Sequence, residues 1–133
     1  MVNKYKNVLV WFRRDLRVRD NRALLQALKE GDRVFCCFVF DTNIIKYLSD
    51  PRDRRIHYIW GSVAELKSRI CSHGGELYVT HGKAEQEILN LSLKLDIDAL
   101  FFAEDYEPYA IKRDDMVTQS LTKLGKKVFR LKD

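Results

Sequence analysis

The sequence is poor in the residues that mark fibrous, disordered or disulfide-linked chains. Its 133 residues include only 6 Gly, 2 Pro and 3 Cys. So little Gly and Pro excludes collagen-like and low-complexity classes. The odd number of Cys, with no CxxC or Cys/His ligand spacing, favours buried, reduced thiols over disulfides or a metal site. No apolar run reaches the roughly 18 to 20 residues that span a bilayer, and residues 1–7 lack the apolar stretch of a secretion signal. We therefore expect a cytoplasmic protein with no membrane partner.

The residues that are present suffice for one folded domain but not for two. Apolar residues make up 46% of the chain and charged residues 32%, a balance that can form a single packed core. Twenty-four Lys and Arg against nineteen Asp and Glu give a net charge of +5. This mild excess fits a polyanionic partner, but it is as common in proteins that have none.

Apolar patterns predict strands that alternate with helices. Strands are expected at 8–12, 34–40, 77–79, 99–102 and 128–131. We expect Asp20 to cap the first helix and Gly31 to end it. Helical spacing predicts the following inner faces for three of the helices: Leu24, Leu25 and Leu28; Ile56, Ile59, Trp60, Val63, Leu66 and Ile70; and, after Pro108, Ile111, Val117, Leu121 and Leu124.

This alternation predicts an α/β fold with right-handed crossovers. We expect a five-stranded parallel sheet, doubly wound and Rossmann-like, with strand order 3-2-1-4-5 and helices on both faces. Such sheets bind ligands at the carboxyl ends of the strands that flank the reversal of strand order, here residues 13–20 and 103–109. Because the chain stops two residues after the last strand, we expect a fragment cut at a domain boundary.

The common signatures of nucleotide binding and covalent catalysis are missing from the sequence. No glycine lies in a GxGxxG or GxxxxGK[ST] pattern, and there is no GxSxG. A standard dinucleotide site, a Walker-type site and a hydrolase are therefore not expected. We assign no catalytic residue and no metal ligand.

A basic segment directly follows the first strand. Residues 11–21 read WFRRDLRVRDN and hold four arginines and two aspartates. These charges could pair with one another inside a loop, or the arginines could line a site for an anionic ligand, since a guanidinium makes two parallel hydrogen bonds to one carboxylate or phosphate. Residues 50–55 are also charged, and there a solvated helix start is favoured over a phosphate clamp.

An acidic segment follows the fourth strand. Residues 101–109 read FFAEDYEPY. Asp105 or Glu107 could simply cap the helix that begins at Pro108. Alternatively, the acids could accept hydrogen bonds from a planar heterocycle that the tyrosines flank.

Four motifs in order along the chain resemble the DNA photolyase and cryptochrome family. The first is VLVWFRRDLRVRDNRAL, close to the family's VWFRRDLR opening and its later DN. The others are FVFD at Phe38 to Asp41, the arginine and glycine pattern from Arg55 to Gly61, and DYEPYAIKRD at Asp105 to Asp114. Together they span nearly the whole chain, and they resemble the family's amino-terminal α/β domain.

The resemblance implies an antenna-chromophore-binding domain of a deoxyribodipyrimidine photolyase. In that family a carboxy-terminal helical domain, absent from this chain, binds FAD and splits cyclobutane pyrimidine dimers flipped out of damaged DNA. The parent enzyme would be a carbon-carbon lyase, whereas this chain alone would bind DNA weakly or not at all. The alternatives are a cryptochrome photoreceptor domain and a stand-alone nucleotide-binding or signalling module.

The resemblance also assigns contacts with the antenna to six positions: Arg13, Phe40, Asp41, Arg55, Asp105 and Glu107. Asp105 and Glu107 would accept hydrogen bonds from the ring system or ribityl hydroxyls, and Arg55 would hold an anionic tail. Arg13 and Asp41 would shape the rim of the site. Folate-binding members carry an Asn-Glu pair where this chain has Tyr109 and Ala110, which favours a deazaflavin or flavin antenna over folate.

Overall fold

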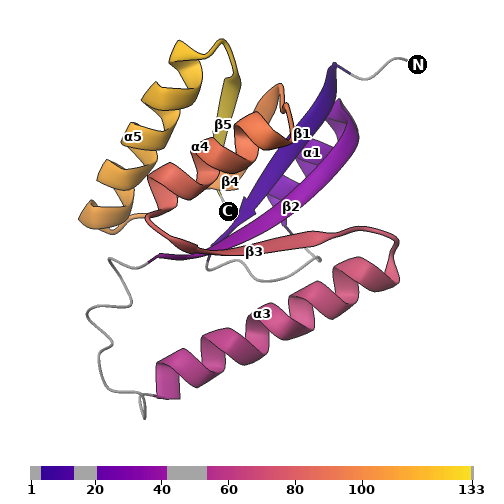
Figure 1. Ribbon diagram of the computed structural model, residues 1–133, viewed down its shortest axis with the longest axis vertical. Helices are drawn as coiled ribbons and strands as arrows, with labels where there is room; N and C mark the ends of the chain where they lie inside the picture. The colour runs from indigo at the N-terminus through magenta and orange to yellow at the C-terminus, as the bar shows by residue number, and fades with distance from the viewer. Residues whose placement is uncertain (1–3, 14–20, 42–53, 133) are drawn as a thin grey trace.

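The computed structural model describes residues 4–13, 21–41 and 54–132, with the side chains of 54–57 excepted. In this part of the chain five strands alternate with four helices (Figure 1). Their bounds are β1 Tyr5–Phe12, α1 Arg22–Glu30, β2 Gly31–Asp41, α3 Arg54–Ser72, β3 Leu77–Gly82, α4 Ala84–Lys94, β4 Ala99–Ala103, α5 Pro108–Lys123 and β5 Lys127–Leu131.

The strands form one parallel sheet in the order β3-β2-β1-β4-β5. In its centre Val10 of β1 lies opposite Cys36 of β2 and Phe101 of β4. The predicted fold class and strand order are therefore confirmed. The strand order reverses at β1, whose carboxyl end is flanked by the ends of β2 and β4.

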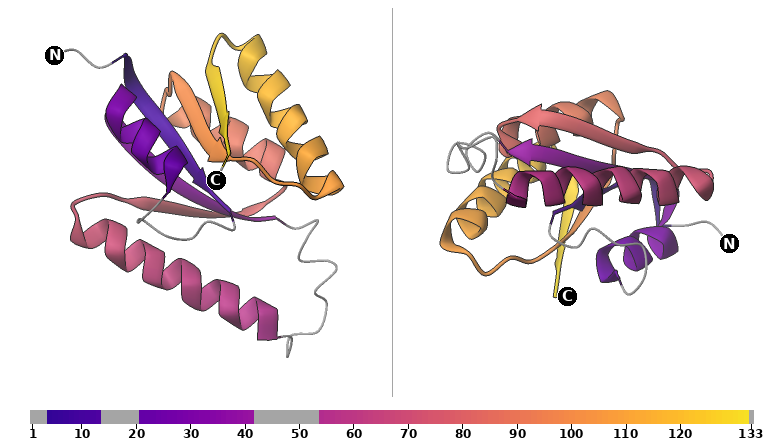
Figure 2. Two further views of the ribbon diagram at one scale, coloured as in Figure 1. Left: turned by 180° about the vertical axis from the view of Figure 1, so that it is seen from behind. Right: turned by 90° about the horizontal axis from the view of Figure 1, so that it is seen from below.

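The sheet is covered on both faces, which explains why its central strands are continuously apolar. On one face α1 and α3 pack against alternate residues of β1, such as Val8, Val10 and Phe12. On the other face α4 and α5 pack against Leu9 and Trp11. Figure 1 shows the sheet from the side of α4 and α5, and the left panel of Figure 2 shows the opposite face, with α1 in front.

The start of α1 and its passage into β2 are fixed by two short contacts. Asn21, rather than the predicted Asp20, is the N-cap: its side chain accepts a hydrogen bond from the Leu24 amide at 3.0 Å. Asp20 lies outside the described residues. Gly31 ends the helix as predicted and is also the first residue of β2. A Cβ at Gly31 would lie 2.5 Å from a methyl group of Val8, so only glycine allows β2 to start this close to β1.

Several predicted inner faces are wrong in part. Leu25 and Leu28 of α1 are exposed, and so are Ile111 and Leu124 of α5. The buried face of α5 is instead formed by Ala110, Arg113, Asp114, Val117 and Leu121. The charged residues Arg113 and Asp114 thus lie on the buried face, where the spacing rule expects only apolar residues.

The three thiols divide into two buried and one exposed. Cys36 and Cys37 lie in β2, and burial raises the pKa of Cys36 to about 12. Cys71, near the end of α3, is exposed, which corrects the expectation that all three are buried. No helix of the described residues is long and apolar enough to cross a membrane.

Candidate functional site

The carboxyl ends of β1 and β4 are joined by Arg13. This residue directly follows β1, and its guanidinium donates a hydrogen bond to the carbonyl of Ala103, the last residue of β4. It also forms an ion pair with Asp114 of α5. The ends of the two strands at the reversal point are thus in contact, as the strand order requires. Residues 14–20, the rest of the basic segment, lie outside the described residues.

The contacts of Arg13 are internal. Its side chain is 8% exposed and that of Asp114 is 0% exposed. The guanidinium lies 4.9 Å from the centroid of the Trp11 ring and 4.7 Å from that of Phe102, within the range of cation–π attraction. These contacts favour a structural role for Arg13, in which it neutralises a buried carboxylate. The predicted role at the rim of a ligand site stays a prediction.

A second arginine extends this network to the end of β2. Arg113 of α5 lies 3.5 Å from Asp114 and 3.4 Å from Asp41, the last residue of β2. Its guanidinium also lies 5.0 Å from the centroid of Trp11. Two arginines and two aspartates therefore balance in charge beneath the carboxyl edge, and they fasten α5 to β1 and β2.

Asp41 connects this buried network to an exposed residue, Tyr109. Its carboxylate is buried and accepts a hydrogen bond from the Tyr109 hydroxyl at 3.1 Å. Tyr109 lies in the first turn of α5, and its side chain is exposed. Asp41 thus positions an aromatic ring that remains accessible from solvent.

A pair of stacked aromatic rings lies on the other face of β2. Phe40 is buried and stacks on Trp60 of α3, with the ring centroids 4.4 Å apart and an interplanar angle of 26°. Trp60 is 54% exposed. The indole therefore covers Phe40 with one face and leaves much of its surface open. This corrects the assignment of Trp60 to the core, and no sequence signal distinguished it from the other apolar residues of α3.

The acidic segment after β4 is partly used to build its own turn. One carboxylate oxygen of Asp105 accepts hydrogen bonds from the amides of Tyr106 at 2.7 Å and Glu107 at 3.0 Å. Glu107 is the N-cap residue of α5, but its side chain makes no capping hydrogen bond and is exposed. Asp105 therefore shapes the turn, and Glu107 is an exposed residue at the start of α5.

Two of the six predicted contact residues, Phe40 and Asp41, lie on opposite faces of the sheet. They are consecutive in β2 and point toward Trp60 and Tyr109 respectively. Arg55 is the second residue of α3, but its side chain lies outside the described residues. In the part of the chain that the structure describes, two accessible aromatic rings lie on either side of the end of β2, and we call this arrangement the antenna edge.

The fold and this edge define a doubly wound α/β domain of the class that binds ligands at the carboxyl ends of its strands. The family model described as DNA photolyase matches residues 8–133. The chain therefore belongs to the photolyase and cryptochrome family and corresponds to its amino-terminal α/β domain.

Individual relatives include both photolyases and cryptochromes. The chain is 31% identical over 126 residues to a deoxyribodipyrimidine photo-lyase of Synechococcus sp., covering 95% of this chain and 26% of the relative. It is 33% identical over 122 residues to cryptochrome-1 of Aedes aegypti, covering 84% and 21% of the two chains. An archaeal photolyase from Sulfolobus tokodaii, solved with two FAD molecules, superposes with a TM-score of 0.82 at 28% identity, covering 96% and 29%. The chain thus spans about a quarter of the length of these relatives.

Proposed function

We propose that this chain is the antenna-binding domain of a light-driven photolyase that repairs cyclobutane pyrimidine dimers in DNA. Its ligand is a flat pigment that lies across the carboxyl end of β2, and a deazaflavin or flavin fits better than a folate. The observation that carries the proposal is the pair of accessible rings, Trp60 and Tyr109, held on either side of that strand end by Phe40 and Asp41.

The described residues fit a flat heterocycle in three respects. Trp60 offers an open indole surface for stacking, and its orientation is fixed by the buried ring of Phe40. Tyr109 offers a second ring, fixed by its hydrogen bond to Asp41. Glu107 presents a carboxylate that can accept hydrogen bonds from ribityl hydroxyls or ring N–H groups. The proposed contact of Arg55 with an anionic tail rests on the family resemblance alone.

Position 110 supports the preference for a deazaflavin or flavin. Folate-binding members of the family carry an acid there, within an Asn-Glu pair, whereas this chain has Ala110. Ala110 is buried against the sheet side of α5, so the position offers neither a charge nor an accessible polar atom. A folate held in that way would lack one of its side-chain partners.

The task of the protein in this proposal is to bind and orient the pigment. When bound, an antenna pigment absorbs light and passes the excitation energy to a reduced flavin in the helical domain, which splits the dimer. The rigid α/β sheet would fix the orientation of the pigment through Trp60 and Tyr109, and the buried Arg13–Asp114 pair would hold α5 and β4 in place. The partners are a carboxy-terminal FAD domain and, through it, damaged DNA.

A cryptochrome photoreceptor domain is the second candidate, because the mosquito cryptochrome is as similar to this chain as the Synechococcus photolyase. Both functions would use the same antenna edge. The two would be distinguished by measuring light-dependent loss of cyclobutane dimers from an oligonucleotide with the parent protein, which carries its own FAD domain in this proposal.

Reconstitution tests the proposal. The purified chain is incubated with a deazaflavin, a flavin or a folate, passed through a desalting column, and its absorbance spectrum is recorded. We expect about one deazaflavin or flavin per chain to be retained. Saturable binding of ATP, with all three pigments ignored, would favour the nucleotide-binding module instead.

Two variants, each with a control, localise the bound pigment. Trp60→Ala should weaken pigment binding about fivefold or more, since stacking of a ring contributes about 1–3 kcal/mol. Tyr58→Ala is the matched control, because Tyr58 is an exposed aromatic two residues away on α3. Glu107→Gln should weaken binding, whereas Asp105→Asn, which keeps an oxygen for the turn amides, should bind normally if Asp105 only shapes the turn.

A further inference from the structure

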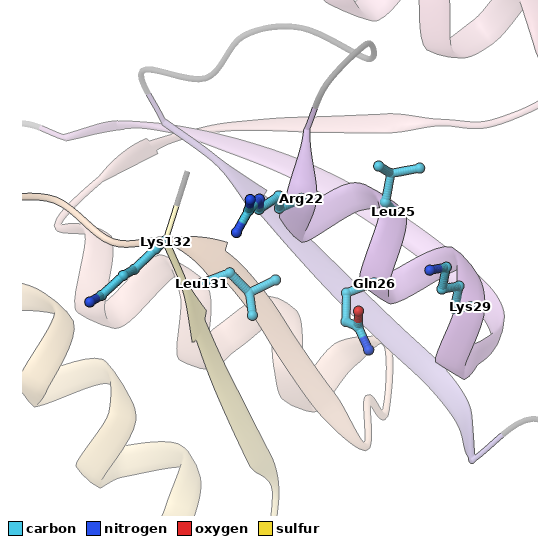
Figure 3. Close-up of a pocket in the computed structure, with 6 residues that line it drawn as sticks. All are labelled: Arg22, Leu25, Gln26, Lys29, Leu131 and Lys132. Carbon is cyan, nitrogen blue, oxygen red and sulfur yellow. The ribbon is translucent and has the colours of Figure 1, made fainter.

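A cleft separate from the antenna edge lies between α1 and the edge strand β5 (Figure 3). Its volume is about 270 Å³, and six residues line it: Arg22, Leu25, Gln26, Lys29, Leu131 and Lys132. We call it the α1–β5 cleft. The first four residues come from one side of α1, and the last two come from the end of β5 and the residue after it.

The cleft exists because the sheet extends beyond the helix that covers it. On this face α1 packs over the centre of the sheet, and β5 lies to one side of it (Figure 2, left). Phe129 and Leu131 of β5 point to this face and are only partly buried. On the other face of β5, Val128 is also partly buried and packs against the core beneath α4 and α5. The edge strand is thus partly open, and on the face of α1 it borders the cleft.

One of the apolar side chains at the cleft, Leu25, is a residue that the spacing rule assigned to the core. Leu25 is 51% exposed, whereas its neighbour Leu24 is buried. Together with Leu131 it provides an apolar surface next to a half-covered sheet.

The charged side chains at the cleft have one sign. Arg22, Lys29 and Lys132 line it, and its lining includes no Asp or Glu. Within residues 4–13, 21–41 and 54–132, none of these three cations takes part in an ion pair. The apolar floor is therefore bordered by positive charge that no described carboxylate neutralises.

We propose that the α1–β5 cleft is the docking site of an acidic amphipathic helix. The layer that covers a face of a doubly wound sheet is helical, and a helix lying beside α1 would cover Leu25, Phe129 and Leu131 together. An added strand would instead pair with the outer edge of β5 and leave the cleft open. Asp and Glu along the borders of the helix would pair with Arg22, Lys29 and Lys132.

This proposal does not rest on the antenna function. The cleft is built from α1 and β5, and it shares no residue with the edge formed by Phe40, Asp41, Trp60 and Tyr109. Failure of pigment binding would therefore leave the docking site untouched, and the reverse also holds.

Selection from a library tests the chemistry of the partner. The 133-residue chain is immobilised and used to select from a phage library of helical 16-residue peptides, randomised at every position except a few alanines. Selected sequences should be enriched in Leu, Ile or Phe at spacings of three and four residues, with Asp or Glu beside them. Recovery of basic or extended sequences would overturn the proposal.

Matched variants test the location. Binding of a selected peptide, measured by fluorescence anisotropy, should weaken at least about tenfold on Leu25→Glu and on Lys29→Glu. The controls are Leu93→Glu and Lys94→Glu in α4, which are equally exposed on the opposite face and should bind normally. Circular dichroism verifies that each variant is folded.

Three outcomes would contradict the proposal. Equal binding by the α1 and α4 variants would place the peptide elsewhere. Dimerisation of the chain that Leu25→Glu abolishes would identify a second copy as the occupant. Competition by a DNA duplex, lost on Lys29→Glu, would identify a nucleic acid surface.

Discussion

Replacing Arg13 by methionine removes one of the two cations that neutralise the buried carboxylate of Asp114. The side chain of Asp114 is fully buried, and its second oxygen, Oδ2, has no hydrogen-bond partner among the described residues. After the substitution, Arg113 at 3.5 Å is the one cation that the described residues leave paired with this carboxylate. Methionine retains the apolar stem over Trp11 and Phe102 but provides no charge and no donor for the Ala103 carbonyl.

The expected loss of stability is about 3 kcal/mol. Breaking a buried ion pair by removing one partner typically costs about 3–5 kcal/mol, and the remaining Arg113 places this case at the lower end. The double variant Arg13→Met, Asp114→Leu should lose less than the sum of the two single variants, by at least about 1 kcal/mol, because it leaves no buried carboxylate unpaired.

The assay is urea unfolding followed by circular dichroism. The matched control is Arg130→Met, which breaks the ion pair between Arg130 and Asp115. The side chain of Arg130 is 26% exposed and that of Asp115 is 54% exposed. An exposed pair of this kind contributes under about 1 kcal/mol. If Arg13→Met lowered the free energy of unfolding no more than Arg130→Met does, Arg13 would not be an internal structural residue. The predicted role of Arg13 at a ligand site would then be favoured instead.

Three further predictions concern glycine and the thiols. Gly31→Ala should lower the free energy of unfolding by about 1–3 kcal/mol, since the new Cβ would lie 2.5 Å from Val8. Gly61→Ala, at a helical site with no atom within 4 Å, should raise it by about 0.5–1 kcal/mol; thermal melts that reverse this order would refute the packing at Gly31. A thiol reagent at pH 8 should label only Cys71 in the folded chain and all three thiols in denaturant, and rapid labelling of Cys36 would contradict its burial. Because burial raises the pKa of Cys36 from 9.0 to about 12, the unfolded chain releases this proton first, so stability should fall as the pH rises from 9 toward 12.

The sheet could be predicted because each strand and helix carries its own apolar pattern in a short stretch of sequence. The central strands carry apolar residues on both faces, and each helix between them shows an apolar stripe, so order and handedness follow from general rules of connection. The boundary at Gly31 was equally accessible, because one glycine both ends a helix and allows close approach of two strands.

The buried face of α5 could not be predicted in the same way. Arg113 and Asp114 are buried only because Asp41 and Arg13 meet them from the ends of two strands. These contacts join residues that are distant in the sequence: Arg113 and Asp41 are 72 positions apart, and Arg13 and Asp114 are 101 positions apart. A rule that counts apolar spacing along one helix does not include such contacts.

The position of the candidate site follows from the strand order, whereas its detail does not. The reversal of strand order predicts a site at the carboxyl edge, and Phe40 and Asp41 lie at that edge. Trp60 was missed because its spacing matches that of the core residues on α3. Whether an aromatic residue of a helix is buried or exposed depends on how far the sheet extends beneath it. That extent is set by how helices and sheet pack together, which the spacing along one helix does not report.

The central claim is that a pigment binds across the end of β2, and NMR titration of the nitrogen-15-labelled chain with a deazaflavin tests it most directly. The account predicts saturable shifts of the amides of Phe40 and Asp41, the Trp60 indole and the first turn of α5, with the amides of α1 and β5 unchanged. Shifts confined to the α1–β5 cleft, or none at saturating pigment in a folded chain, would contradict it.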